Sequence, residues 1–513
     1  MNTPKVRPRT IHWLYQLSTC NRLQLCDTTM PSEFPVSTQR CNLRPVLVDC
    51  ARSYGHLLHS NDPPSPSEYA DISEILHNTS NRIEQLDASV QPSDQVEKAH
   101  LKWLIEAYRP ILSPLRKFPV ELLMEIFKHT AKGFFPVFDM SQSPWLLGRV
   151  CRGWRAVSRS SAEFWTSLSL EGCPRPGIPE NQEKVLAILE DALTMSKESD
   201  LSIRYSLTRV PLDTDSLLIR MLISQSYRWK DVHLTISPDL VPDIRKIDGH
   251  LLSKLVRLHL APCGLGVLPE EALEPFLHAP NIRDVTLHLV AHSYSLLLHS
   301  PLWQRLTHFR NDHPATIDDH LTFLSQLNGL ESYAVPWCIE TRGSGSMSLT
   351  PITHETLRSL QIQDVDLLQY LVCPALEALS VTIFEVKRPE LDLLHVFRQF
   401  STQSCNIQHL TLSVPFIGGN YYSLMNKLST ILFPRLHSFT LFVVPHRDFQ
   451  MPPRPFLCSV LAFIEARWHP GTLLRRVAIT TGFGDVESEL LDRLRMFKEE
   501  GLDISYKGKG IQI

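Results

Sequence analysis

The sequence predicts short helices in its N-terminal part, followed by an irregular β/α solenoid with parallel strands on its concave face. Three observations support this fold class, which is α+β before the solenoid and α/β within it. Apolar residues recur at helical spacing before residue 170. One apolar pattern recurs along the rest of the chain. Two proline-rich breaks, 62–67 and 172–180, separate the parts.

These breaks divide the chain into four predicted regions. They are a poorly ordered extension (1–66), an amphipathic helix with the heptad spacing of a short coiled coil (67–109), a small all-α module (110–170) and the solenoid (171–513). Within 1–50, basic and apolar residues precede the first acidic residue, Asp27, which is also typical of a mitochondrial targeting segment. We favour a disordered extension, or an incorrectly predicted start of the gene, over targeting.

The second region has apolar residues at alternating steps of four and three, which is heptad spacing. They are Ile72, Leu76, Thr79, Ile83, Leu86 and Val90, and Pro92 ends the run. A second amphipathic helix restarts at Val96 and continues to Tyr108. Two interpretations remain: a dimerisation helix, or a helix packed against its own chain. We favour the second, because three heptads are near the lower limit for a coiled coil.

The third region contains more apolar surface than short helices can bury among themselves. Pro119 stands where a first helical turn begins, and Glu121 faces the positive end of the helix dipole. Leu122, Leu123, Ile126 and Phe127 then recur at helical spacing, which predicts a first helix. A second helix is predicted from near Ser143 to Val157. A partner surface is therefore expected on this module.

Two motifs of this region resemble the F-box family. They are Leu115-Arg116-Lys117-Phe118-Pro119-Val120-Glu121-Leu122-Leu123-Met124-Glu125-Ile126-Phe127 and Val150-Cys151-Arg152-Gly153-Trp154-Arg155, with Phe164-Trp165 following. The whole chain resembles F-box proteins of mushroom-forming (agaricomycete) fungi. This resemblance implies docking on a Skp-type adaptor and, through it, on a cullin. Carried over by position, the implied adaptor-binding residues are Leu115, Phe118, Pro119, Leu122, Leu123, Ile126, Val150, Cys151 and Trp154.

The fourth region repeats a pattern in which an apolar residue is followed three and five positions later by two others. Its members are Trp229-Val232-Leu234, Leu255-Leu258-Leu260, Ile282-Val285-Leu287, Leu330-Tyr333-Val335, Leu357-Leu360-Ile362, Leu376-Leu379-Val381, Ile407-Leu410-Leu412, Leu436-Phe439-Leu441 and Leu474-Val477-Ile479, with a degraded copy at Leu306 and Phe309. The pattern resembles the leucine-rich repeat, in which strands line a concave face and helices cover the outside. Covering helices are predicted at 367–371, 391–397 and 457–464.

The repeats are divergent. The leucine-rich-repeat family usually has Asn or Cys three residues after the last strand residue, where the side chain bonds loop backbone. Cys263 and Cys338 fit this rule, whereas Val290, Val365 and Pro415 do not. An ordinary α/β domain with apolar alternation in its strands is the alternative, and we favour the solenoid because the pattern recurs so often.

Composition limits the function. Lys and Arg number 51 against 54 Asp and Glu, so a nucleic-acid partner is not expected. Eleven dispersed cysteines indicate reduced thiols and a cytoplasmic or nuclear protein, and no apolar run is long enough to span a membrane. We expect no catalytic residue, no metal and no cofactor.

The sequence therefore predicts a substrate-receptor subunit of an SCF-type cullin–RING ubiquitin ligase. The module would dock on the adaptor, and the solenoid would capture an unknown protein substrate. The alternative is a repeat scaffold outside the ubiquitin system, in which the module only caps the solenoid.

Overall fold

The computed structural model describes most of the chain beyond residue 52, in two compact units formed by 2–199 and 200–513. The described residues are 53–58, 60, 62–87, 91–131, 133–171, 179–264, 266–288, 300, 303–312, 315–335, 350–363, 365–383, 390–415, 425, 428, 432–444, 454–469, 473–481, 488–508 and 511–512. The predicted extension or targeting segment at 1–50 lies outside them. Along the chain, the boundary between the two units falls between Ser199 and Asp200, whereas the sequence analysis puts it at 170/171.

After a short helical segment at 53–58, the N-terminal unit continues with a helical hairpin. Its first helix, α3 (Pro66–Leu86), begins at a capping box, in which Ser65 Oγ accepts the Glu68 N–H at 3.3 Å. The second helix, α4 (Pro92–Tyr108), begins at the proline expected to end the heptad run. An ion pair between Arg82 and Glu97, with 2.8 Å between Nε and Oε1, joins the two helices.

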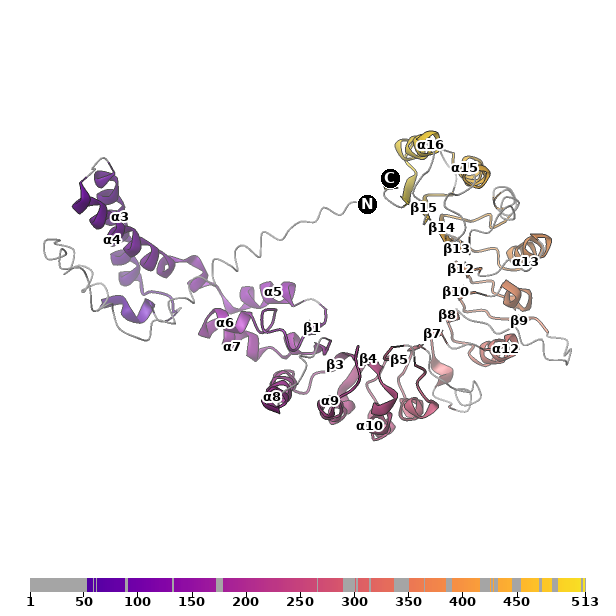
Figure 1. Ribbon diagram of the computed structural model, residues 1–513, viewed down its shortest axis with the longest axis horizontal. Helices are drawn as coiled ribbons and strands as arrows, with labels where there is room; N and C mark the ends of the chain where they lie inside the picture. The colour runs from indigo at the N-terminus through magenta and orange to yellow at the C-terminus, as the bar shows by residue number, and fades with distance from the viewer. Residues whose placement is uncertain are drawn as a thin grey trace. The chain divides into compact units, whose positions relative to one another are not determined.

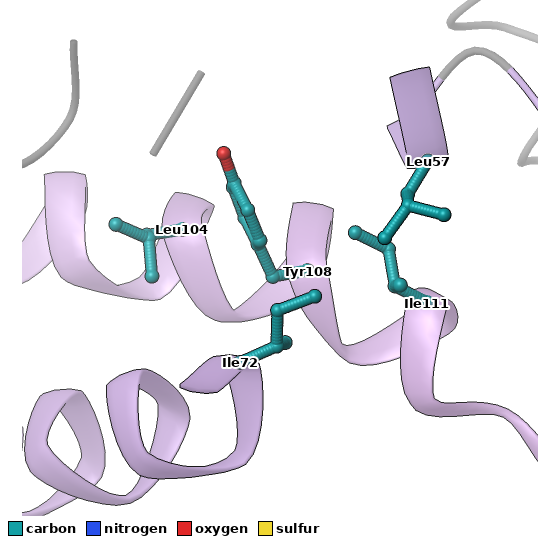
Figure 2. Close-up of a cluster of buried hydrophobic side chains, with 5 residues drawn as sticks. All are labelled: Leu57, Ile72, Leu104, Tyr108 and Ile111. Carbon is teal, nitrogen blue, oxygen red and sulfur yellow. The ribbon is translucent and has the colours of Figure 1, made fainter. Parts of the chain in front are cut away.

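The hairpin is closed by a small apolar cluster that draws on four elements (Figure 2). The buried members are Leu57, Ile72, Leu104, Tyr108 and Ile111. Ile72 and Ile111 are fully buried, and Ile72 is the first residue of the predicted heptad run. The helix α3 thus packs against its own chain, which is the interpretation that the sequence analysis favours over dimerisation.

The rest of the N-terminal unit is a compact set of short elements. They are 3₁₀ helices η3 (Arg109–Leu112), η4 (Pro114–Lys117) and η5 (Ala162–Trp165), helices α5 (Val120–Thr130), α6 (Leu147–Val150), α7 (Arg152–Ser160) and α8 (Pro179–Met195), and strands β1 (Phe135–Pro136) and β2 (Ser167–Ser169). The strands pair in parallel, with Phe135 opposite Leu168. The Val137 N–H extends this pairing by donating to the Ser169 carbonyl at 2.9 Å. The all-α prediction missed this pair because two residues are too short to show alternation.

The predicted second helix of the module is broken in two. Cys151 has extended backbone (φ −159°, ψ 174°), so α6 ends before it and α7 begins after it. The continuous apolar spacing across 146–157 concealed this break, because the side chain of Cys151 caps α7 in place of a helical turn.

The C-terminal unit is built on one long sheet. Its parallel strands, in spatial and chain order, are β3 (Leu201–Ser206), β4 (Trp229–Ile236), β5 (Arg257–Pro262), β6 (Asp284–Leu287), β7 (His308–Asn311), β8 (Ser332–Val335), β10 (Ser359–Ile362), β12 (Ala378–Thr382), β13 (His409–Pro415), β14 (Ser438–Val444), β15 (Arg476–Thr481) and β16 (Asp503–Gly508). β17 (Ile511–Gln512) pairs antiparallel to β16, and β9 (Ile352–Thr353) pairs with β11 (Leu371–Val372) in a separate small sheet. Sequential parallel pairing makes this unit an α/β solenoid.

Helices cover one side of this sheet, and its strands line the inner side of the arc in Figure 1. The helices are α9 (Asp213–Ile223), α10 (Val241–Ile244), α12 (Ile317–Gln326), α13 (Glu390–Gln403), α15 (Arg454–Arg467) and α16 (Ser488–Glu499). Two of the three predicted covering helices correspond to α13 and α15. The prediction at 367–371 was wrong in type, because a 3₁₀ helix, η12 (Val365–Tyr370), runs there and Leu371 belongs to β11.

The recurring apolar residues form continuous layers between sheet and helices. In register, Leu379 lies opposite Leu410, Leu410 opposite Phe439 and Phe439 opposite Val477. These four side chains are buried, as are the other predicted members of the pattern. The predicted strand cores are therefore confirmed as strands, and β3 and β16 extend the array at both ends.

Leucine-rich repeats usually have Asn or Cys three residues after the last strand residue, and Cys263 is the fitting residue that the structure describes. Cys263 follows β5, and its thiol donates to the Arg209 carbonyl oxygen at 3.5 Å, which satisfies backbone of the neighbouring loop. Cys338 and Val290 lie outside the described residues.

Removing one layer member should destabilise the solenoid. We expect Leu441→Ala, at a fully buried position of β14, to cost about 2–5 kcal/mol through lost burial and a cavity. Thr440→Ala, on the opposite face of the same strand, should change stability by less than about 0.5 kcal/mol. Native-state hydrogen exchange of β13–β15 amides in the full chain measures both effects, and equal effects would contradict the assignment of faces.

The solenoid should also lose stability in mild acid. His320 is fully buried on α12, with its Nδ1 2.8 Å from Tyr333 Oη, and burial lowers the pKa of His320 to about 4. Between this value and the unfolded value of about 6.5, the unfolded chain binds more protons, so falling pH removes stability, by up to about 3 kcal/mol. His320→Gln should flatten the pH dependence of the unfolding midpoint between pH 6.5 and 4.5, and an unchanged slope would refute the assignment.

Candidate functional site

Helix α5 carries two apolar faces, and only one of them is buried. Leu123 and Phe127, four residues apart, are 6% and 0% exposed. Leu122 and Ile126, also four apart, are 50% and 43% exposed. Pro119 is exposed one turn earlier and shares their side of the helix. We call these three residues, Pro119, Leu122 and Ile126, the α5 stripe.

The buried face of α5 rests on aromatic rings from later elements. The Phe127 ring lies 5.0 Å from that of Trp154 and 6.1 Å from that of Phe164, both edge-on. These centroid distances are typical of favourable aromatic pairs. Because the core below α5 is filled, the α5 stripe has no place to turn inward within the module.

A second aromatic group continues this core. Trp165 packs edge-on against Phe135 at 5.8 Å and Trp145 at 4.7 Å between centroids. Its indole N–H donates to the Ser158 carbonyl at 2.8 Å, and the Trp145 N–H donates to the Val137 carbonyl at 2.9 Å. The buried indole N–H of Trp165 and the half-buried one of Trp145 are thereby satisfied, which ties the segments around β1, α6 and α7 together.

The junction of α6 and α7 depends on Cys151. Its Sγ accepts the Trp154 N–H at 3.3 Å, and the Arg155 guanidinium donates to the Gly148 carbonyl at 2.7 Å. These bonds satisfy groups that a helix start and a helix end leave free. Trp154 is thereby held half-buried against Phe127.

Charge reinforces the edge of the module. Lys128 of α5 lies 3.1 Å from a Glu125 carboxylate oxygen and 3.3 Å from one of Glu163 in η5. Hydrogen bonding to Glu125, followed by that to Glu163, raises the pKa of Lys128. The bridge to Glu163 ties α5 to η5 on the surface.

The structure places the implied adaptor-binding residues in three environments. Pro119, Leu122 and Ile126 are exposed, Leu123 is buried, and the half-buried ones are Leu115, Phe118, Val150, Cys151 and Trp154. Leu123 thus belongs to the module's core. Val120, which is 50% exposed, has an accessible apolar side chain that the sequence analysis did not single out. Helical spacing alone could not separate Leu122 from Leu123, because each has an apolar neighbour four residues later.

The inner face of the solenoid is a second candidate surface, and it changes character along the sheet. On and just beyond β4–β7 most inner-face side chains are ionisable, with Thr235, Ala261 and Thr286 as exceptions. We call the ionisable ones the charged face: Asp231, His233, Arg257, His259, Asp284, His288, His308, Arg310 and Asp312. From β8 to β14 the equivalent positions are small or uncharged, apart from His409. Phe442 of β14 is the exception in size, and it is the one large apolar residue in a described strand that is exposed (40%).

Buried carboxylates hold the basic groups of the charged face. Asp231 accepts from Arg257 at 2.6 Å, and Asp312 accepts from Arg310 at 3.3 Å and contacts the His288 imidazole. Burial acts to raise the pKa of Asp231, but hydrogen bonds from His233 and Arg257 lower it below its usual value. Burial likewise raises the pKa of Asp284.

His259 lies at the centre of the charged face. Its ring stacks on that of His233, with 5.3 Å between centroids. Burial, followed by the neighbouring His233 and His288, lowers the pKa of His259 to about 4, so this imidazole is neutral near pH 7.

Two further observations concern metal-binding groups and a buried thiol. Among the described residues, no three or more His, Cys, Asp or Glu side chains are grouped to hold a metal ion. Burial raises the pKa of the Cys373 thiol to about 12, so it is not a ready nucleophile. Within the same part of the chain, no helix combines the length and apolarity needed to cross a membrane.

Comparisons with known proteins do not assign a family. No family model matches the chain, and no curated protein matches it. Among solved structures, the crystal structure of a Bacteroides fragilis protein is similar over 56% of this chain and 76% of that chain, with 11% identity and a TM-score of 0.31. Similarity at this level establishes neither a common family nor a common function.

The two faces of α5 should respond differently to truncation. Phe127→Ala removes a fully buried ring from the aromatic core and should destabilise the N-terminal unit by about 3–5 kcal/mol. Leu122→Ala, at an exposed position, should change stability by less than about 0.5 kcal/mol. Limited proteolysis of the full chain, followed at sites in 120–160, measures both, and comparable sensitivity of the two variants would contradict this assignment.

Proposed function

We propose that this protein is a substrate-receptor subunit of an SCF-type cullin–RING ubiquitin ligase. Its module at 110–170 acts as an F-box that docks on a Skp-type adaptor. Its solenoid acts as a divergent leucine-rich-repeat domain that captures a protein target in the cytoplasm or nucleus.

The α5 stripe is the observation that supports this proposal most. Two large aliphatic side chains stand exposed on a helix whose opposite side is anchored in a filled aromatic core. A rigid helix with exposed aliphatic side chains is suited to a protein groove. These residues also fall at positions that the resemblance to the F-box family implies for adaptor contact.

The solenoid supplies the second half of the proposal. Its strands present side chains that are not needed for the apolar layers, and such side chains can bind a protein surface. The change from charged to uncharged positions gives the inner face two chemically distinct parts. Phe442 stands among short side chains, opposite Ser413 and Thr480 in register, where a partner can cover its ring.

In this role the chain contributes proximity to the reaction. Holding the target and the charged ubiquitin-conjugating enzyme in one assembly raises their effective concentration. The residues of this chain bind and orient, and the transfer itself takes place on another subunit.

The adaptor interaction can be tested with a double variant of the α5 stripe. Leu122→Asp with Ile126→Asp places two carboxylates on the proposed contact, so we expect co-purification with a Skp-type adaptor to fall at least tenfold. Both positions are exposed, so the variant should keep the thermal unfolding midpoint of the parent.

A matched control adds the same charges elsewhere. Leu473→Asp with Met496→Asp also replaces two exposed apolar residues, at 47% and 56% exposure, but in the C-terminal unit. It should leave adaptor co-purification intact. Retained adaptor binding by the Leu122/Ile126 variant would overturn the proposal and favour the repeat scaffold whose module only caps the solenoid.

A further inference from the structure

On the charged face, two of the acidic side chains lie deeper than the basic side chains that they bind. The carboxylates of Asp231 and Asp312 lie deep, each with 8% of the side chain exposed. The basic side chains that they hold reach outward: Arg257 is 58% exposed, His288 48% and Arg310 45%. A molecule approaching this part of the sheet therefore meets Arg257 and Arg310 before the carboxylates of Asp231 and Asp312, and the half-buried Asp284 of β6 lies between the two arginines.

The deep carboxylates also restrict how these donors point. Arg257 uses one terminal nitrogen on Asp231, and Arg310 uses Nε on Asp312. A guanidinium carries five N–H donors in a rigid fork, so fixing one side orients the others. Holding the side chains in place before binding reduces the entropy that a partner must overcome.

The donors are spread along the sheet. Arg257 lies on β5, and Arg310 lies on β7, two strands away. Neighbouring strands are about 4.8 Å apart, so the set spans about 10 Å across the strands. Donors at this spread match several carboxylates along an extended chain, whereas a single phosphate needs donors that converge on one point.

We propose that the charged face binds an acidic polypeptide segment, laid across β5–β7, whose carboxylates accept N–H bonds from Arg257 and Arg310. This inference deepens the proposed function, because it rests on the inner face as the capture surface and states the chemistry of the target there. The small, uncharged positions from β8 onward leave room for the continuing chain.

A nucleic acid is a poorer fit to the same face. Nucleic-acid binding neutralises a row of phosphates with several Lys or Arg side chains. This face offers two arginines, Arg257 and Arg310, each already bound to an aspartate, so it suits a few separate carboxylates better than a continuous phosphate backbone.

Binding can be measured by fluorescence anisotropy with the full chain and defined probes. The probes are fluorescein-labelled octaglutamate, octalysine, a peptide with one phosphoserine among neutral residues, and a single-stranded DNA 20-mer. We expect octaglutamate to bind more tightly than the other three. Arg257→Gln with Arg310→Gln should weaken octaglutamate binding about tenfold or more, because charge-assisted hydrogen bonds are lost.

The chain offers a closely matched control at Arg476. This residue occupies on β15 the place that Arg257 occupies on β5, is 61% exposed and is paired with Asp503 at 2.7 Å. Arg476→Gln therefore removes the same charge at an equivalent position, from an ion pair whose carboxylate is 44% exposed instead of 8%. It should leave octaglutamate binding within about twofold of the parent. Thermal melts of each variant establish that the solenoid remains folded.

Several outcomes would overturn the inference. They are equal octaglutamate affinity of the Arg257/Arg310 variant and the parent, an equal loss from Arg476→Gln, and tighter binding of the DNA or the phosphoserine peptide. Should the Arg257/Arg310 variant unfold, Arg310→Gln alone, assayed in the same way, must still lose affinity. Adaptor co-purification is scored separately: its absence together with selective octaglutamate binding would refute the proposed ligase role and leave this inference standing.

Discussion

From Leu201 to Tyr506, each strand of the solenoid bonds to the next in parallel, and the apolar positions stay in line from strand to strand. This register is the constraint on which the rest of the unit depends. A slip by one residue would turn every buried layer member toward solvent and every inner-face residue into the core. The same backbone bonds that fill the core therefore decide which side chains stand side by side on the open face.

The N-terminal unit depends on a different constraint. The elements of its module at 110–170 are too short to form extended layers, so a few large rings, centred on Phe127 and Trp165, fill the centre of the module. The indole N–H groups of Trp145 and Trp165 bond backbone carbonyls and thereby set the positions of the surrounding turns. Because α5 presents one apolar face to these rings, its other apolar face is left as accessible surface.

The solenoid was the more predictable part of the chain. Each repeat places apolar residues at positions that only a strand satisfies, so Leu258, Leu410 and Val477 could be placed in a core from spacing alone. The connections were less predictable, and η12 replaced a predicted helix because its spacing of leucines suits either helix type.

Within the module, sequence could not say which α5 face is buried, because this depends on Trp154 and Phe164, which are distant in sequence. Cys151 was predicted as an adaptor contact, and its observed bond is a helix cap, which local spacing does not reveal. The charged face was also missed, because the contacts of Asp231 with Arg257 and of Asp312 with His288 appear only when neighbouring strands or strand ends are set beside one another.

Buried residues and inner-face residues alternate along each strand. This alternation affects how the sequence of such a protein can evolve. Substitutions at inner-face positions such as Thr440, Ser380 or Arg257 remove little of the buried apolar surface that keeps the chain folded. Substitutions at Leu379 or Leu441 remove much of it. Mutation can therefore sample new binding specificities on one side of the sheet while purifying selection acts mainly on the other. Divergent repeats with constant strand cores are the expected record of that history.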